Sequence, residues 1–150
     1  MSVQQQSLSQ WVTELNDTLY IQPNDDIALK AAHEQVDPSL VIKYTTPTPY
    51  ILVNASNPAR INHNIYTYDQ FMPGLQYVRS STASIQDTFS VILQWENPEK
   101  PDGVVAVLSK WTARDNATGT ETKKTNVILW EVKWIDGKRK LTGQTEVEVV

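Results

Sequence analysis

The sequence contains no cysteine, so disulfide bonds, thiolate catalysis and cysteine-ligated metal sites are excluded. Glycine is scarce, with five residues, and neither a phosphate-binding loop nor a dinucleotide-binding fingerprint occurs. Only two histidines are present, far apart and without a carboxylate at a fixed spacing, which is no recognisable set of metal ligands. We therefore expect a site that uses no metal and no cofactor.

The chain also lacks an excess of positive charge and any long apolar run. Its net charge is −4 and its lysines and arginines are scattered, which argues against a nucleic-acid partner. No stretch is apolar enough to span a membrane, and residues 1–11 have neither the basic nor the apolar part of a secretory signal. We therefore expect a cytoplasmic protein with no membrane partner. Its 150 residues predict one domain, 1–150.

Helical periodicity dominates the first quarter of the chain. A helix is predicted over 7–20, where apolar residues share one face and Ser7, with a glutamine three residues later, forms a candidate capping box. A second helix is predicted over 26–35. A third opens at Thr67, and Pro73 followed by glycine should kink or split it.

Alternation of apolar and polar residues dominates the second half of the chain. Helices followed by an antiparallel meander indicate an α+β fold, in which helices cover one face of a curved, mostly antiparallel sheet and the concave face forms a pocket. Asp136-Gly137 predicts a tight hairpin because both residues tolerate positive φ. The predicted strands are 40–46, 85–95, 104–114, 126–134 and 141–149.

Three segments carry a resemblance to a known superfamily: VDPSLVIKY at 36–44, TYDQFMPGL at 67–75 and VILWEVKWIDGK at 127–138. With the order of elements, they resemble the nuclear transport factor 2-like superfamily, which includes SnoaL-like polyketide cyclases and ketosteroid isomerase. The resemblance covers nearly the whole chain and implies a cone-shaped α+β fold. It also implies a homodimer through the outer sheet face, and the outward Val127 and Leu129 agree with that. This fold hosts isomerases, cyclases, dehydratases, hydrolases and non-enzymatic adaptors, so it does not specify an activity.

The sequence departs from the ketosteroid isomerase pattern at both catalytic positions. Ungapped matching places Tyr44 where that family has a general-base aspartate late on its first strand. It places Trp130 where the family has a second acid on the penultimate strand. Neither carboxylate is present, so steroid isomerisation by that mechanism is not expected.

Four residues are candidates for catalysis. Asp87 falls on the apolar face of strand 85–95, where burial would raise its pKa, although a strand start can also be wet. His33 lies on the inner, apolar face of the second helix. It could transfer a proton, or it could be a histidine packed in the core. His63 lies in the irregular link before the third helix. It could act as an acid or base, or it could be a solvated side chain. Tyr44 could point into the cone and donate to a developing oxyanion.

Aromatic side chains are the main candidates for ligand binding. Rings that line a cone would suit a flat, hydrophobic ligand, and the alternative is that they build the core or a dimer face. Asn126 begins an inward row and could orient a substrate carbonyl or cap the strand end. The aromatic candidates are Trp11, Phe71, Trp111 and Trp130.

Two functions remain open from these residues. The first is a cofactor-independent isomerase, cyclase or dehydratase that acts by acid–base catalysis on a hydrophobic, carbonyl-bearing small molecule, such as a polyketide or another secondary metabolite. The second is a non-catalytic small-molecule-binding or dimerisation module of the same fold. A protein-interaction adaptor would instead have a nearly filled cone and an exposed apolar patch.

Overall fold

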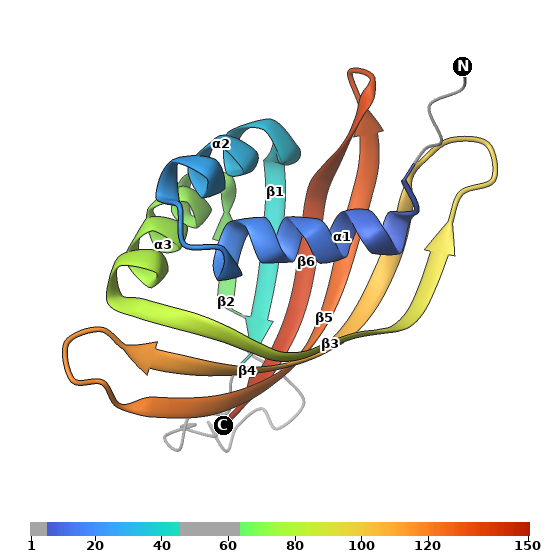
Figure 1. Cartoon of the computed structure of the whole chain (residues 1–150). Coiled ribbons are helices and arrows are strands. Elements are labelled where there is room, and N and C mark those ends of the chain that lie inside the picture. Colours follow the sequence, from blue (N-terminus) through green and yellow to red (C-terminus); the bar gives the residue numbers. More distant parts are fainter. Residues whose placement is uncertain (1–5, 46–63) are drawn as a thin grey trace, which may run out of the picture.

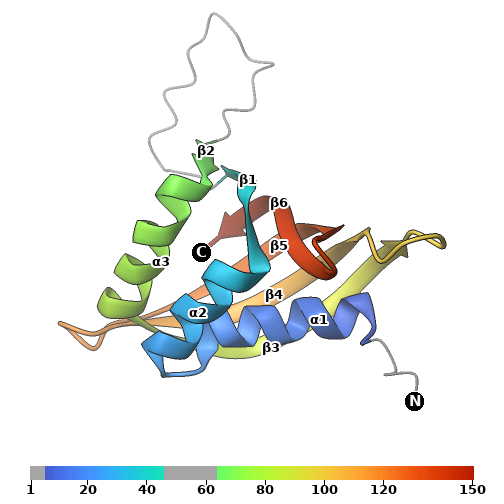
Figure 2. The same ribbon diagram turned by 90° about the horizontal axis from the view of Figure 1, so that it is seen from above.

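The computed structural model describes residues 6–45 and 64–150. Its helices gather on one side of a curved sheet, with α1 crossing in front of the strands (Figures 1 and 2). A short π-helix, η1, continues α1. No helix in the described part of the chain is long and apolar enough to cross a membrane. The helices are α1 (Leu8–Asn16), η1 (Asp17–Ile21), α2 (Asp25–Gln35) and α3 (Tyr68–Ser81).

The described strands form one sheet in the order β2-β1-β6-β5-β4-β3. Neighbouring strands are antiparallel except β1 and β6, which are parallel, and the sheet stays open between its edge strands β2 and β3. The expected α+β fold with a curved, mostly antiparallel sheet is therefore confirmed. The strands are β1 (Val36–Thr45), β2 (Asn64–Thr67), β3 (Thr82–Glu96), β4 (Gly103–Asp115), β5 (Glu121–Ile135) and β6 (Lys138–Val149).

Local signals in the sequence explain where most elements begin and end. The Ser7 hydroxyl accepts a hydrogen bond from the backbone of Gln10 at 3.2 Å, and the Gln10 side chain accepts from the Ser7 backbone at 3.3 Å, which confirms the capping box. Asp136 and Gly137 have φ values of 53° and 80°, as the predicted hairpin requires. The predicted split at Pro73 is wrong, because α3 is continuous through this residue. Phe71 and Leu75, on either side of Pro73, are both buried in the core.

A bulge near the start of β3 reverses the face that alternation predicted for this strand. Gln86 pairs with Trp111 and Thr88 pairs with Lys110, so Asp87 is an extra, unpaired residue. Because side chains alternate with a period of two, one extra residue exchanges the two faces of a strand. Asp87 is consequently exposed, and its predicted place on a half-buried apolar face is wrong.

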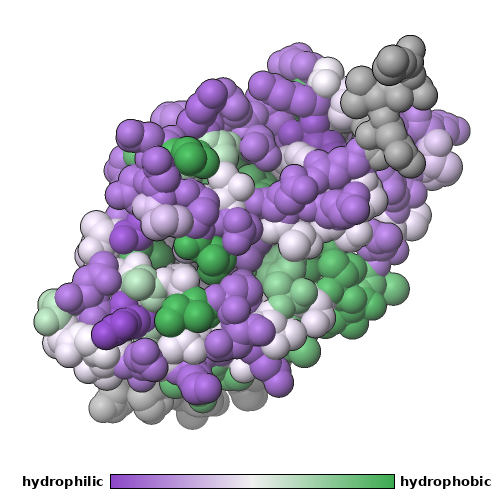
Figure 3. Space-filling model, in the orientation of Figure 1, coloured by the Kyte–Doolittle hydropathy of each residue, from purple (hydrophilic) through white to green (hydrophobic). Residues whose placement is uncertain are grey.

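A second irregularity in β3 leaves apolar side chains on an open edge of the sheet. Val91 pairs with Val107 and Leu93 pairs with Ala106, which leaves Ile92 unpaired. Figure 3 shows hydrophobic surface beside α1, in the region where β3 runs in Figure 1. The exposed apolar residues in this part of β3 are Val91, Ile92, Leu93 and Trp95.

A bulge in β6 has the larger consequence for the concave face. Leu141 pairs with Val132 and Gly143 pairs with Glu131, so Thr142 is the extra residue. Leu141 is fully buried in the core, whereas beyond the bulge the even-numbered residues face inward. The inward residues after the bulge are Gln144, Glu146 and Glu148.

The apolar core lies between the helices and the sheet. It combines the inner faces of α1, α2 and α3 with inward residues of β1, β4, β5 and β6. The largest fully buried side chain is Trp130. Trp130 belongs to the core and also lines the cavity on the concave face.

Gly103 supplies a direct test of this packing. A Cβ atom there would meet the backbone carbonyl of Trp95 and would lie 2.5 Å from Leu8 Cδ2, neither of which can move freely. We expect Gly103→Ala to lower the free energy of unfolding by about 1–3 kcal/mol, as overpacking does. Gly74→Ala is the matched control, because no atom lies within 4 Å of its added Cβ and alanine favours the helix. Urea unfolding measures both, and equal stability of the two variants would contradict the packing described.

Candidate functional site

A cavity of about 320 Å³ opens on the concave face of the sheet. Its walls come from α1, η1, α3 and strands β1 to β6, so segments from most of the described chain meet there. The volume lies in the range of small-molecule sites. Aromatic rings supply much of the wall, namely Tyr20, Tyr44, Tyr66, Trp111 and Trp130.

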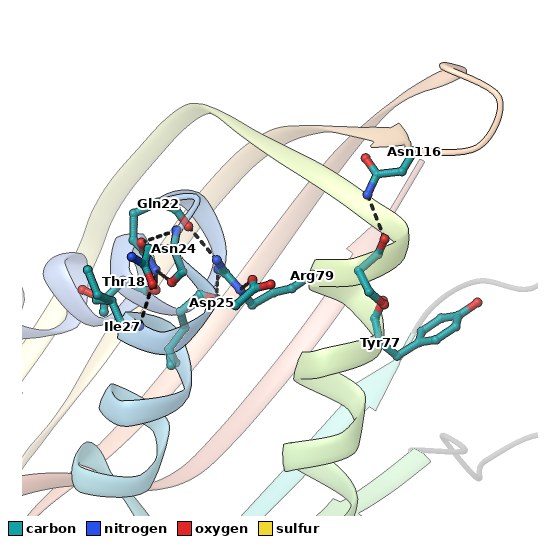
Figure 4. A network of polar contacts seen from close by, with 10 residues as sticks. Thr18, Gln22, Asn24, Asp25, Ile27, Tyr77, Arg79 and Asn116 are labelled. Atoms are coloured by element: carbon teal, nitrogen blue, oxygen red, sulfur yellow. Dashed lines mark hydrogen bonds and ion pairs between the residues drawn. The ribbon is translucent and has the colours of Figure 1, made fainter.

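Arg79 holds the helical side of the cavity together. Its Nε pairs with Asp25 Oδ1 at 2.8 Å, and its two terminal nitrogens donate to the carbonyls of Leu19 and Gln22, each at 2.8 Å (Figure 4). These contacts tie α3 to the end of η1 and to the start of α2. The π-helical turn therefore has a fixed position, and its residues Tyr20 and Ile21 line the cavity.

Asn126 is the centre of a hydrogen-bonded cluster on the sheet side. Its Oδ1 accepts from the Trp111 indole at 2.7 Å, and its Nδ2 donates to Glu148 Oε2 at 2.9 Å and also to Glu146. Lys124 pairs with Glu148 at 3.0 Å and lies 5.1 Å from the centre of the Trp111 ring. One ammonium thus faces two carboxyl groups, and it is bonded directly to Glu148.

Glu146 is the carboxyl group best suited to move a proton. It is partly accessible from the cavity, and its Oε2 accepts from Gln144 Nε2 at 2.9 Å. Burial raises the pKa of Glu146, and the nearby charge of Glu148 raises it further. The hydrogen bonds from Asn126 and Gln144 and the charge of Lys124 act in the other direction, but the net shift is upward.

Tyr20 is a neutral hydroxyl beside that carboxyl group. Burial raises the pKa of Tyr20, and the negative charge of Glu146 raises it further. Its phenol therefore keeps its proton at all ordinary pH values and can act as a hydrogen-bond donor. The cavity therefore combines a carboxyl group that can titrate, Glu146, with a neutral hydrogen-bond donor, Tyr20.

The structure brings together some of the predicted site residues. Tyr44, Trp111, Asn126 and Trp130 all line the cavity. Trp111 and Trp130 come from neighbouring strands, and Asn126 and Trp130 from the same inward row of β5. The candidate His63 lies outside the described residues.

Four other candidates lie away from the cavity. Asp87 is exposed and accepts from the Thr112 hydroxyl at 2.8 Å. His33 is exposed on α2, and its Nδ1 lies 3.5 Å from the hydroxyl of Tyr68, so its predicted inward position is wrong. Phe71 is buried in the core and Trp11 packs against it, so both serve the packing of the helices.

Sequence reasoning missed the acidic residues of the cavity. On β6 the polar residues Gln144, Glu146 and Glu148 alternate with Thr145, Val147 and Val149, and alternation favours this less polar set as the inward one. The bulge at Thr142 reverses that choice. The available signal was Gly143 at the bulge, because glycine inside a strand often marks one.

Comparison with known proteins reveals likeness in three dimensions only. No family model and no curated protein matches the sequence. A ketosteroid isomerase-like protein from Erwinia carotovora atroseptica is 11% identical, with a TM-score of 0.62 over 93% of this chain and 91% of that one. An NTF2-like protein from Rhodospirillum rubrum is 10% identical, with a TM-score of 0.61 over 97% of this chain and 100% of that one.

A third solved structure is also similar in fold. It is a protein of the SnoaL-like polyketide cyclase type from Mesorhizobium loti, 15% identical, with a TM-score of 0.50 over 94% of this chain and 98% of that one. Identities this low bear on the fold alone. The chain has the nuclear transport factor 2-like fold, as the resemblance of its segments predicted.

The shifted pKa of Glu146 can be tested by carbon-detected NMR of the side-chain carboxyl groups. We expect Glu146 to titrate above the usual glutamate value. Lys124→Met should move its midpoint higher still, because the ammonium favours the charged form. Lys138→Met, at the β5–β6 hairpin, is the control and should leave the midpoint unchanged. A midpoint at or below the usual value would show that solvation outweighs burial.

Proposed function

We propose that this chain is a cofactor-independent isomerase, cyclase or dehydratase that acts by acid–base catalysis on a hydrophobic, carbonyl-bearing small molecule. A polyketide or another secondary metabolite fits that description. The observation that carries the proposal is the Glu146 carboxyl group, whose pKa is raised by burial in a cavity walled by aromatic rings. A carboxylate base gains strength as its pKa moves toward neutrality.

The chemistry begins with removal of a proton from the carbon next to the substrate carbonyl. The Glu146 carboxylate takes this proton, and the electron pair of the broken C–H bond moves to the carbonyl oxygen. The neutral hydroxyl of Tyr20 donates to the enolate oxygen where charge develops. In a substrate with a double bond between the β- and γ-carbons, return of the proton from Glu146 to the γ-carbon moves that double bond next to the carbonyl group, which completes an isomerisation without any other reactant.

The position of Glu146 in the sheet supports this role. In the register of the strands it pairs with Tyr44 on β1 and with Ile128 on β5. Tyr44 occupies the place that the family resemblance assigns to a general base, and Trp130 the place of its second acid. The carboxyl group of this chain therefore comes from β6, the strand between those two positions.

The likeness to known folds supports the class of reaction and no finer detail. Similar structures include a ketosteroid isomerase-like protein and a protein of the SnoaL-like polyketide cyclase type. The substrate and the reaction type are parts of the proposal, since one fold supports many activities.

A non-catalytic binding module is the second candidate. It is favoured by the residues at the two family positions, Tyr44 and Trp130, because neither is a carboxylate. In such a module the cavity would bind its ligand, and Glu146 would serve only to orient Asn126 and Gln144. Measurement of proton transfer separates the two candidates.

Exchange of carbon-bound protons gives the test of catalysis. We expect the protein to accelerate the exchange of the α-protons of 2-tetralone in D2O, followed by proton NMR. The rate should rise with pH through the raised pKa of Glu146, because only the ionised carboxylate accepts a proton. Glu146→Gln should lower the rate by about 100-fold or more, as loss of a general base does.

Glu131→Gln is the matched control for this experiment. Glu131 lies on the neighbouring strand β5, is exposed and does not line the cavity. Its variant should exchange protons at the rate of the unaltered protein. Exchange that is equally fast in Glu146→Gln, or no acceleration by the unaltered protein, would leave the binding module as the better description.

The outer face of the sheet supports pairing of two copies of this chain. Val127 on β5 is 48% exposed and lies between Leu108 on β4 and Val147 on β6, the latter 47% exposed. Leu129 continues the same row and is also exposed. We propose that a second copy covers this apolar strip, since the two-fold pairing of one strip with itself buries it on both partners.

Sedimentation velocity tests the homodimer. The unaltered protein should sediment as a dimer at micromolar concentration, and Val127→Lys should shift it to the monomer, because a charge in an apolar contact is costly to bury. Ile27→Lys is the control, since Ile27 is 52% exposed on α2, on the helical side of the molecule. A monomer for the unaltered protein would refute the pairing.

A further inference from the structure

Two buried polar atoms, on residues that line the cavity, have no hydrogen-bond partner among the residues that the structure describes. They are the indole nitrogen Nε1 of Trp130 and the amide oxygen Oε1 of Gln144. Both residues line the cavity, and their exposed fractions are 0% and 5%. Buried polar atoms in native proteins are nearly always hydrogen-bonded, so an unpaired donor and acceptor at a cavity wall indicate a ligand site.

These two atoms belong to neighbouring side chains. Trp130 on β5 and Gln144 on β6 are partners in the antiparallel register, which places their side chains on the same face with Cβ atoms about 5 Å apart. One atom is a donor and the other an acceptor. A single small group of a ligand can therefore reach both.

The orientation of the Gln144 amide follows from its contact with Glu146. Gln144 Nε2 donates to Glu146 Oε2 at 2.9 Å. An ionised carboxylate can only accept hydrogen bonds, so the amide nitrogen faces Glu146 and the amide oxygen is left for another partner. This arrangement fixes Gln144 as an acceptor next to the Trp130 donor.

We propose that Trp130 and Gln144 bind a hydroxyl group of the ligand. The hydroxyl oxygen accepts from the Trp130 indole, and the hydroxyl proton is donated to Gln144 Oε1. A carbonyl oxygen would leave Gln144 without a donor, and an ammonium group would leave Trp130 without an acceptor. A hydroxyl group both accepts and donates, so it can form the two hydrogen bonds at once.

This inference rests on the proposed small-molecule site and narrows its substrate class to hydroxylated hydrophobic molecules. Gln144 bonds to Glu146, so the bound hydroxyl lies one side chain away from the carboxyl group that takes the proton. The substrate would therefore carry its hydroxyl near the carbon that is deprotonated. The pair sets the orientation of the ligand, and Glu146 acts on it.

Matched aromatic probes test the inference without a known substrate. We expect 2-naphthol to bind about 10-fold more tightly than 2-methylnaphthalene, which has the same shape but forms no hydrogen bond. 2-Methoxynaphthalene, which can only accept, should bind more weakly than 2-naphthol. Isothermal titration calorimetry measures the affinities, and the two probes that can accept from the Trp130 indole, 2-naphthol and 2-methoxynaphthalene, should shift its NMR signal more strongly than 2-methylnaphthalene does.

Variants of the two residues assign the preference to this pair. Gln144→Met and Trp130→Phe should each reduce the preference for 2-naphthol to about 2-fold or less, while the affinity for 2-methylnaphthalene stays near that of the unaltered protein. Trp134→Phe is the control, because Trp134 is on the same strand but 41% exposed. If Trp130→Phe does not fold, Gln144→Met and the indole signal decide the question.

The outcomes separate this inference from the proposed catalysis. Equal affinity for the three probes, or a preference that survives Gln144→Met, would overturn the hydroxyl site. A preference for 2-naphthol without exchange of 2-tetralone protons would support the hydroxyl site and leave the catalytic proposal refuted. Exchange of 2-tetralone protons without a preference for 2-naphthol would support the catalytic proposal and refute the hydroxyl site.

Discussion

The bulge at Thr142 determines the chemistry of the concave face. Residue Leu141, on one side of it, is fully buried in the core, while Glu146, on the other side, faces the cavity. Without the extra residue, the period of two would keep one row of side chains inward along the whole strand. Thr145, Val147 and Val149 would then line the hollow, and the carboxyl groups would face outward. One unpaired residue thus converts part of an apolar sheet face into a polar cavity wall.

The two acidic side chains of the cavity, Glu148 and Glu146, differ in the groups that stabilise their negative charge. Glu148 has an ion pair with Lys124 at 3.0 Å and a hydrogen bond from Asn126 at 2.9 Å. Glu146 has amide donors but no directly bonded cation among the described residues, and its burial raises its pKa. An ionised carboxylate there costs folding free energy, and this cost is the source of its basicity. The ionised Glu146 carboxylate therefore lowers the stability of the fold at the place where proton transfer is proposed.

The helical side of the cavity depends on contacts with the backbone rather than on apolar packing alone. Arg79 bonds to two carbonyls at the end of η1 and to Asp25 at the start of α2. Carbonyls at a helix end lack partners inside the helix, so a buried guanidinium stabilises them and fixes the turn in space. Tyr20 consequently has a defined place opposite the sheet, which a donor to a developing oxyanion needs.

Local patterns in the sequence determined the helices, the hairpins and the fold class. Ser7 caps the first helix and Asp136-Gly137 forms the β5–β6 turn as predicted, because capping and turn formation depend on residues only a few positions apart. The same patterns indicated an inward row that includes Trp130, and this ring lies in the core at the cavity wall. Strand pairing decided which face the other side chains occupy. Asp87 was expected on the inner face, but the bulge in the pairing of β3 with β4 leaves it exposed.

The acidic row of β6 shows most clearly what the tertiary structure alone decided. The face of a strand depends on its register with a neighbour, and a bulge is a property of two strands together. Gly143 within β6 indicates that a bulge can occur there, but only the pairing with β5 shows that Thr142 is skipped. The sequence by itself determined most of the helices and the long strands, because those choices depend on near neighbours, but it did not predict the short edge strand β2. Which side chains meet in the cavity was decided only by the pairing of segments that lie far apart in the chain.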